Sequence, residues 1–407
     1  MRYFQEARRI DDGIGEGKKG TKMSTAQRAL RVVRKVILCV PLLAVPSAQA
    51  ATINAASCSQ ADIQIAIDSA ATGDTVALPG GTCTWSSTVN IPNTKGIILN
   101  GGGATISGNI HVAQNTGAAS RITQFNFVRN NTTSHSIDID GSKTHAPFRV
   151  DGNTFTYNTG GSTIIELFGN APGLIDHNIF SCPQNCEMIH NMGMGASDAS
   201  GWSDDVLPGS SNAVYIEDNS FSNNGVSGNP AYFYGSSSVQ SYYGARTVFR
   251  HNTLLMSQVD QHGTPGMIGA RWWEIYENTF NTGVPNASQC CFISLRGGSG
   301  VVFHNHHTGA NLNGNSIDLY EEDTGYPALY QIGRGKNQAL DPAYVWGNDV
   351  FFSVGSQTPA MVQVNRDYYL AAKPSYTPFT YPYPLEANGL PDPYGGPPSA
   401  PVNLRIR

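Results

Sequence analysis

The chain has 407 residues, of which only 14% are charged, with 44 glycines and a formal net charge of −5. Residues 1–50 hold ten Lys and Arg against four Asp and Glu, so the remainder carries a net charge of −11. That charge argues against nucleic acid as a general partner, and an anionic substrate would need local arginines or a bridging cation.

The first 50 residues have the pattern of an upstream extension followed by a secretory signal peptide. Four basic residues between 28 and 35 precede the apolar run 36–45, and Ala48-Gln49-Ala50 follows as a cleavage site. Ten apolar residues broken by Pro41 are too few for a membrane span. We expect a mature, monomeric chain from near Ala51, secreted to the periplasm or the extracellular space.

Residues 59–70 show helical apolar spacing, with Ile63, Ala66 and Ile67 on one face and Ser59 or Asp62 as the N-cap candidate. A strand is predicted to begin at 75. Such a helix can cover the open end of a solenoid, which the remaining sequence predicts.

A phrase of short apolar and β-branched residues ending in Asn recurs along the chain. Its three clearest copies end at Asn252, Asn278 and Asn305, at spacings of 26 and 27 residues. Further copies end at Asn153, Asn178 and Asn219, and weaker ones at Asn126 and Asn348. Units of about 25 residues that are rich in Gly, Asn, Thr and Ser predict coils of a right-handed parallel β-helix. Asn tolerates left-handed backbone angles in the turn, and its amide can form a ladder from coil to coil.

A second strand with alternating aliphatic and polar residues accompanies the Asn phrase. Its copies are 137–140, 165–168, 293–296, 317–320 and 362–365. We expect one β-helix domain over 51–385, in which the Pro-rich end lies against the last coil, and a tail or linker over 386–407.

Six cysteines follow the cleavage site, and an even number in an exported chain favours disulfides. We expect Cys58–Cys83 and Cys182–Cys186, each closing a local loop. The adjacent Cys290 and Cys291 could form a vicinal bridge or stay reduced. A structural zinc site is the alternative, which the spacings do not support.

Residues 61–92, followed by the Gly-rich stretch 96–108, resemble the opening of many secreted proteins of the pectin-lyase-like superfamily. Together with the Asn phrases, the resemblance extends over about 57–370. It implies the β-helix fold. It does not assign chemistry, because the superfamily contains lyases, hydrolases, esterases, epimerases, tailspikes and adhesins.

Four long insertions, at about 182–212, 222–245, 306–316 and 321–342, are expected to form the walls of a groove for an extracellular polysaccharide. Alignment on the Asn phrase places one column of residues at the outer end of the second strand. The column holds Asp140, Phe168, Ala270 or Arg271, Arg296, Tyr320 and Asn365 or Arg366.

The superfamily's pectate lyases use Arg as base and carboxylate-bound calcium as electrophile. The resemblance therefore implies Arg271 or Arg296 as the base of a β-elimination on a uronate-containing glycan. Independently of the resemblance, His262 could act as a general base or acid near neutral pH, or be a turn residue beside Gly263. Pairing of each Arg with carboxylates of neighbouring coils is the alternative. Candidate substrate contacts are Arg250, Tyr243, Asp260, Trp272 and Tyr320.

The acidic triplet Glu321, Glu322 and Asp323 offers oxygen ligands that suit Ca²⁺, although it could simply begin a solvated loop. His304, His306 and His307 suggest metal binding as well, but no third distant ligand is apparent in the sequence.

Two other functions remain open. Polygalacturonase-like hydrolases have Asp-Asp, Gly-His-Gly and Arg-x-Lys motifs in this order. Here 204–205, 261–263 and 334–336 follow that order, but the His motif lacks its first Gly and the Asn-x-Asp strand is missing. A non-catalytic, glycan-binding or adhesive β-helix is the third interpretation. The scarcity of lysines weakens the lyase hypothesis, because many lyases place a Lys beside the base.

Overall fold

The computed structural model describes residues 50–130, 135–159, 163–183, 186–195, 198–223, 237–263, 268–282, 291–309, 314–322 and 327–387. They belong to the unit Gln49–Arg407. The predicted signal peptide, Cys290 and Asp323 lie outside these ranges.

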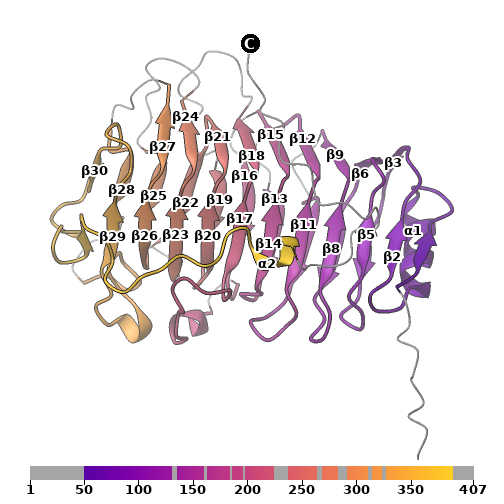
Figure 1. The fold of residues 1–407 in the computed structure, drawn as a ribbon, viewed down its shortest axis with the longest axis horizontal. Coiled ribbons are helices and arrows are strands. Elements are labelled where there is room, and N and C mark those ends of the chain that lie inside the picture. The colour runs from indigo at the N-terminus through magenta and orange to yellow at the C-terminus, as the bar shows by residue number, and fades with distance from the viewer. Residues whose placement is uncertain are drawn as a thin grey trace, which may run out of the picture. The chain divides into compact units, whose positions relative to one another are not determined.

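The described residues form a right-handed parallel β-helix with three sheets (Figure 1). Sheet A comprises β1 (Thr52–Asn54), β2 (Thr75–Ala77), β5 (Ile98–Asn100), β8 (Ser120–Thr123), β11 (Phe148–Asp151), β14 (Gly173–Asp176), β17 (Val214–Glu217), β20 (Arg246–Arg250), β23 (Trp272–Tyr276), β26 (Ser299–Phe303), β29 (Ala343–Trp346) and β31 (Tyr368–Tyr369). Sheet B comprises β3 (Thr82–Thr84), β6 (Thr105–Ser107), β9 (Asn126–Arg129), β12 (Thr154–Tyr157), β15 (Ile179–Cys182), β18 (Ser220–Asn223), β21 (Thr253–Leu255), β24 (Thr279–Asn281) and β27 (His306–Thr308). Sheet C comprises β4 (Val89–Ile91), β7 (Ile110–Ala113), β10 (Ile137–Asp140), β13 (Thr163–Phe168), β16 (Glu187–Asn191), β19 (Ser237–Ser241), β22 (Gln258–Gln261), β25 (Ile293–Leu295), β28 (Ile317–Leu319) and β30 (Val354–Gly355).

A ladder of buried Asn side chains fixes the corner between sheets A and B. From Asn153 to Asn348, each Nδ2 donates to Oδ1 of the next ladder Asn at 2.9–3.1 Å. The Asn prediction is therefore confirmed for seven coils. The left-handed residue, however, is the one before each Asn, such as His251 (φ 55°).

The core consists of the residues that alternate inward on the three sheets. Two positions after the ladder residue, Phe127, Phe155, Phe180 and Phe221 stack with ring centroids 4.8–5.1 Å apart. The weak copy at Asn126 is shifted by one residue, because Phe125 occupies that ladder position and donates its N–H to Oδ1 of Asn153. Asn126 instead begins β9 and is paired with Thr154.

The N-terminal end is covered as predicted. Helix α1 (Gln60–Ser69) begins after Ser59, whose side chain accepts from the N–H of Asp62. Its apolar face joins the core of the β-helix. The expected disulfides Cys58–Cys83 and Cys182–Cys186 are both present and are compatible with an oxidising compartment.

The C-terminal strap, residues 374–387, crosses the outer face of sheet A instead of lying against the last coil (yellow in Figure 1). It includes α2 (Pro384–Ala387), while the short helices η1 (Ser200–Trp202) and η3 (Lys336–Gln338) lie in the insertions. Tyr376 donates to Glu274 on β23, the N–H of Tyr383 donates to Glu217 on β17, and Arg149 on β11 donates to the carbonyl of Glu386. None of the described helices is long and apolar enough to span a membrane.

Candidate functional site

Sheet C carries polar residues on its outer face over consecutive coils. The β-register aligns Glu166, His190, Gln240, Asp260, Ser294 and Asp318 in one row. These positions alternate with buried aliphatic residues such as Val259 and Ile293, so the row faces away from the core.

A second row, two residues further along each coil, contains the candidate catalytic side chains. It holds Tyr242, His262, Arg296 and Tyr320, whose backbone N–H groups each donate to the preceding coil. Arg296 and Tyr320 therefore lie in one column, as predicted. The position assigned to Ala270 or Arg271 is taken by His262, because β22 ends at Gln261 and the next residue continues the column.

Arg296 is held between two carboxylates. Its Nε and Nη2 donate to the two oxygens of Asp260 at 3.2 and 2.5 Å, and its Nη1 lies 3.0 Å from Oε2 of Glu322. Burial alone would lower the pKa of Arg296, but Asp260 and Glu322 raise it above its usual value. A raised pKa disfavours Arg296 as a base and favours it as a permanent cation.

His262 has the opposite electrostatic environment. Burial lowers its pKa, against the attraction of Asp260, so the imidazole is neutral near pH 7. Its Nδ1 lies 3.1 Å from the carbonyl oxygen of Gly263 and must donate there, which leaves Nε2 as the unprotonated nitrogen. The ring stacks on Tyr242 at 4.3 Å.

Two tyrosine hydroxyls flank these groups. Tyr242 donates to Oε1 of Gln240 at 2.5 Å, so its proton is already used. The hydroxyl of Tyr320 accepts from Ser294 at 3.5 Å, and its own proton is available. Burial raises the pKa of Tyr320 to about 12, so this phenol is protonated at neutral pH. Tyr243 is half-buried, with its ring centroid 5.9 Å from that of Tyr242.

Arg271 lies apart from the two rows. It precedes β23 of sheet A, where Nη1 is 3.4 Å from Asp341 and the guanidinium lies 5.6 Å from the ring of Trp202. Burial lowers the pKa of Arg271. Among the described residues, no contact joins Arg271 to His262 or Arg296, so the structure does not support Arg271 as their catalytic partner.

Two expected substrate contacts are buried on sheet A, and Arg250 lies beneath the strap. Arg250 is 0% exposed, pairs with Glu217 at 2.6 Å and donates to the carbonyls of Phe379 and Thr380. Trp272 is 3% exposed and donates to Glu274. Neither side chain can contact a polysaccharide in this conformation, so these two expectations are corrected. Asn365 and Arg366 also leave the column, since they lie outside the strands of sheet C.

The acidic triplet does not converge in its described part. Glu321 is buried and accepts from the N–H of Glu322, whose own carboxylate pairs with Arg296. Calcium binding there stays a prediction. A closer set of ligand atoms belongs to His135, Asp138 and Glu166, within 4.8 Å of one another. Although burial opposes it, hydrogen bonds to Asp138 and Glu166 raise the pKa of His135 to about 9, so a proton competes with any metal.

Sequence reasoning missed His190 and Gln240. They lie on β16 and β19, which carry no regular aliphatic alternation, and only the register reveals them. His190 stands with its ring centroid 4.9 Å from that of Tyr242 and connects it to Glu166, 3.5 Å from His190 Nδ1.

No protein-family model matches the sequence, and the curated proteins contain no match. Among solved structures, an alginate lyase from Paenibacillus sp. strain FPU-7 is similar over 75% of this chain and 91% of its own, with 13% identity and a TM-score of 0.32. At this level of similarity, the functional assignment has to rest on the geometry of the site.

Proposed function

We propose that the protein is a secreted polysaccharide lyase that cleaves a uronate-containing glycan on the outer face of sheet C. The observation that carries the proposal is the juxtaposition of a neutral, half-buried imidazole, a fixed guanidinium and a protonated phenol on three successive coils. β-Elimination needs these three functions: a base, a cation for the carboxylate, and an acid for the leaving oxygen.

Arg296 supplies the carboxylate site. Asp260 fixes one edge of its guanidinium, while the partner on the other edge, Glu322, is 34% exposed. An exposed ion pair is worth little and can be exchanged. The uronate carboxylate displaces Glu322 from Nη1 and is neutralised there, which acidifies the proton at C5 of the sugar.

His262 and Tyr320 complete the proton transfers. Nε2 of His262 takes the C5 proton, the electron pair forms the C4–C5 double bond, and the C4–O4 bond breaks. The leaving O4 takes the proton of the Tyr320 hydroxyl. The phenolate is then reprotonated from solvent while the imidazolium loses its proton, so no water is consumed.

The test is incubation of the mature protein with a panel of acidic polysaccharides, with and without Ca²⁺, followed by ultraviolet absorbance of the unsaturated uronate. We expect absorbance to rise on one substrate, and Arg296→Lys to reduce the rate because the ammonium lacks the bidentate fork. A full rate in Arg296→Lys, or no unsaturated product on any substrate, would refute the mechanism. A requirement for Ca²⁺ would support the calcium prediction at 321–323.

A hydrolase is the second candidate, favoured by Glu187. Burial raises the pKa of this carboxyl, and Asp260 and Glu166 raise it further, as a general acid requires. Hydrolysis would produce new reducing ends without unsaturated product, and Glu187→Gln would abolish them.

A further inference from the structure

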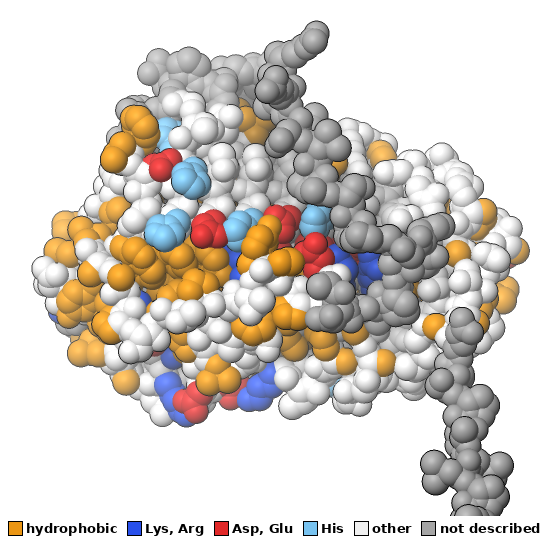
Figure 2. Space-filling view, viewed as in Figure 1, with side chains coloured by type: hydrophobic (Ala, Val, Ile, Leu, Met, Phe, Trp, Pro, Cys, Tyr) orange, Lys and Arg blue, Asp and Glu red, His pale blue; other side chains and the backbone are white. Residues whose placement is uncertain are grey.

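A second set of titratable side chains lies on the corner between sheets A and B, outside the candidate site. The residue before each ladder Asn has a left-handed backbone, with φ of 53–57° at His177, Asp218, His251, Glu277 and His304. We call these five residues the corner row. Figure 2 shows His and acidic side chains alternating along this line.

The fold itself does not require these residue types. Gly152 and Gly347 occupy the same turn position on neighbouring coils, at φ of 62° and 63°. Glycine adopts this conformation without strain, whereas His and Glu do so at a cost. The backbone turn therefore does not account for the alternation of imidazole and carboxylate side chains along the corner row.

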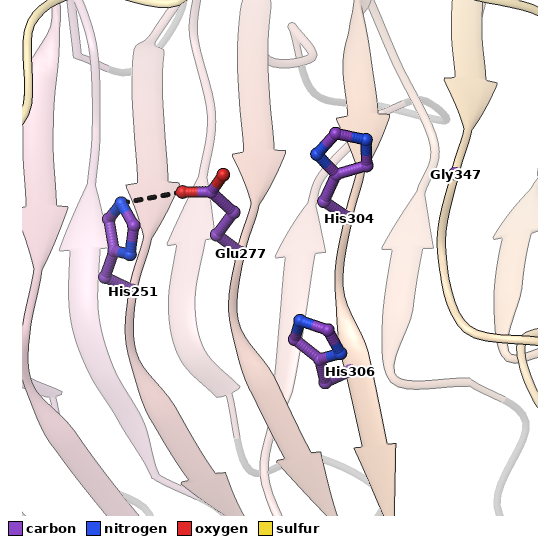
Figure 3. Close-up of a pocket in the computed structure, with 5 residues that line it drawn as sticks. All are labelled: His251, Glu277, His304, His306 and Gly347. Carbon is purple, nitrogen blue, oxygen red and sulfur yellow. Dashed lines mark ion pairs between the residues drawn. The ribbon is translucent and has the colours of Figure 1, made fainter.

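Three residues at one end of the corner row, His251, Glu277 and His304, line a surface hollow (Figure 3). His306 and Gly347 complete its lining. Nε2 of His251 lies 2.9 Å from Oε2 of Glu277. A Cβ atom at Gly347 would lie only 2.6 Å from Cδ2 of His304, so glycine leaves room for that ring. Neighbouring coils thus bring a further imidazole and a carboxylate to the hollow that His304 and His306 line, although no three of these side chains have their ligand atoms within 4.8 Å of one another.

Several of these side chains are already oriented. Nδ1 of His306 lies 3.2 Å from Asp349, whose other oxygen accepts from the N–H of His307. A carboxylate on one imidazole nitrogen orients the other nitrogen toward a metal. His251 stacks on Tyr381 with ring centroids 3.7 Å apart, which fixes the plane of its imidazole ring.

We propose that His251, Glu277, His304 and His306 bind one divalent transition-metal ion of the Zn²⁺ class, with Asp349 positioning His306. Three imidazoles and one carboxylate suit Zn²⁺, Co²⁺ or Ni²⁺, whereas Ca²⁺ prefers oxygen ligands alone. Neighbouring coils are about 4.8 Å apart, and His251 and His304 lie on either side of the coil that carries Glu277. Both imidazoles therefore have to turn toward Glu277 to reach one ion with metal–nitrogen bonds of about 2 Å. His304 is turned toward Gly347 and has to rotate about its side-chain bonds, which its exposure permits.

The test is calorimetric titration of the full mature chain, purified without a histidine tag, with Zn²⁺, and visible spectroscopy with Co²⁺. We expect one ion per chain, Co²⁺ bands typical of four-coordination and a Zn²⁺-dependent rise in melting temperature. The double variant His251→Gln/His304→Gln should lose the Co²⁺ bands and bind Zn²⁺ at least about a hundredfold more weakly. Asp349→Asn should weaken binding by about tenfold or more.

His111→Gln is the matched control, because His111 is ion-paired with Asp140 on sheet C and is remote from the hollow. It should bind like the wild type. Absence of Zn²⁺ binding by the wild type, or undiminished binding by the folded double variant, would overturn the proposal. If His135→Gln alone abolished binding, the ion would belong to the set His135, Asp138 and Glu166.

Discussion

Replacement of Asn278 by Ala tests the ladder directly. Asn278 is 0% exposed, and its Oδ1 accepts from both the backbone N–H and Nδ2 of Asn252, at 2.9 and 3.1 Å. Its own Nδ2 donates to the carbonyls of Phe249 and Tyr276 and to Asn305. Alanine leaves the buried backbone N–H of Asn252 without an acceptor, and it removes the amide donor from the carbonyls of Phe249 and Tyr276. Each lost partner of a buried group costs about 1–3 kcal/mol, so we expect a loss of about 3–5 kcal/mol in the free energy of unfolding.

Equilibrium urea unfolding, followed by circular dichroism, measures this loss. The matched control is Asn158→Ala, whose amide makes one exposed hydrogen bond to Asn130 and should change stability by less than about 0.5 kcal/mol. Asn278→Asp should be as damaging as Asn278→Ala, because a carboxylate cannot donate to the facing carbonyls. Equal stabilities of Asn278→Ala and the control would refute the view that the ladder holds the coils in register.

Three further predictions concern single side chains. His262→Gln should lower kcat by about 100-fold or more, while the control variant His111→Gln on β7 leaves kcat unchanged. Wild-type activity should fall as pH drops through the lowered pKa of His262, and a pH-independent rate would contradict this. The pKa of His135 is raised from 6.5 to about 9, so its stabilisation is complete below the lower value and lost as pH rises through the higher one. Thermal melts across this pH range should therefore show the wild type to be more stable than His135→Gln by about 1–2 kcal/mol in the free energy of unfolding on the acid side, after allowance for solvent screening. The two stabilities should converge above about pH 9. Arg250→Met leaves the carboxylate of Glu217 buried without its partner and should lower the free energy of unfolding by about 3–5 kcal/mol. Limited proteolysis should then cleave the strap faster than in the wild type, and a protease-resistant strap would argue against this ion pair as its anchor.

The period of the Asn phrases predicted the architecture because each coil repeats the same physical problem. From Asn153 to Asn348, each turn between sheets A and B has buried donors and acceptors, and an Asn amide satisfies both. The weak copy at Asn126 was misplaced by one residue because Phe125 fills the ladder position without an amide. A single sequence cannot show that shift, because Phe and Asn both fit the local pattern.

The site was only partly predictable for a related reason. Arg296 and Tyr320 follow regular sheet C strands and were placed correctly in one column. Alignment on the Asn phrase put Ala270 or Arg271 in the column in place of His262. The reason is that residues 262–271, between β22 and β23, lie between the end of the sheet C strand and the Asn phrase used as reference. Arg250 is buried by carbonyls that lie 129 and 130 residues away in sequence, and no local pattern indicates such a contact.

The strap gives the protein a contact that forms only when the coils are complete. Neighbouring coils contact each other over about 25–45 residues of sequence, so stacking can begin at any point and spread. The strap instead joins residues 102 to 237 positions apart, from Glu274 back to Arg149. Such distant contacts form late in folding, since the intervening chain must first be ordered. During synthesis, the strap also leaves the ribosome after every coil that it contacts, so its docking marks the point at which the outer face of sheet A is no longer open to other chains.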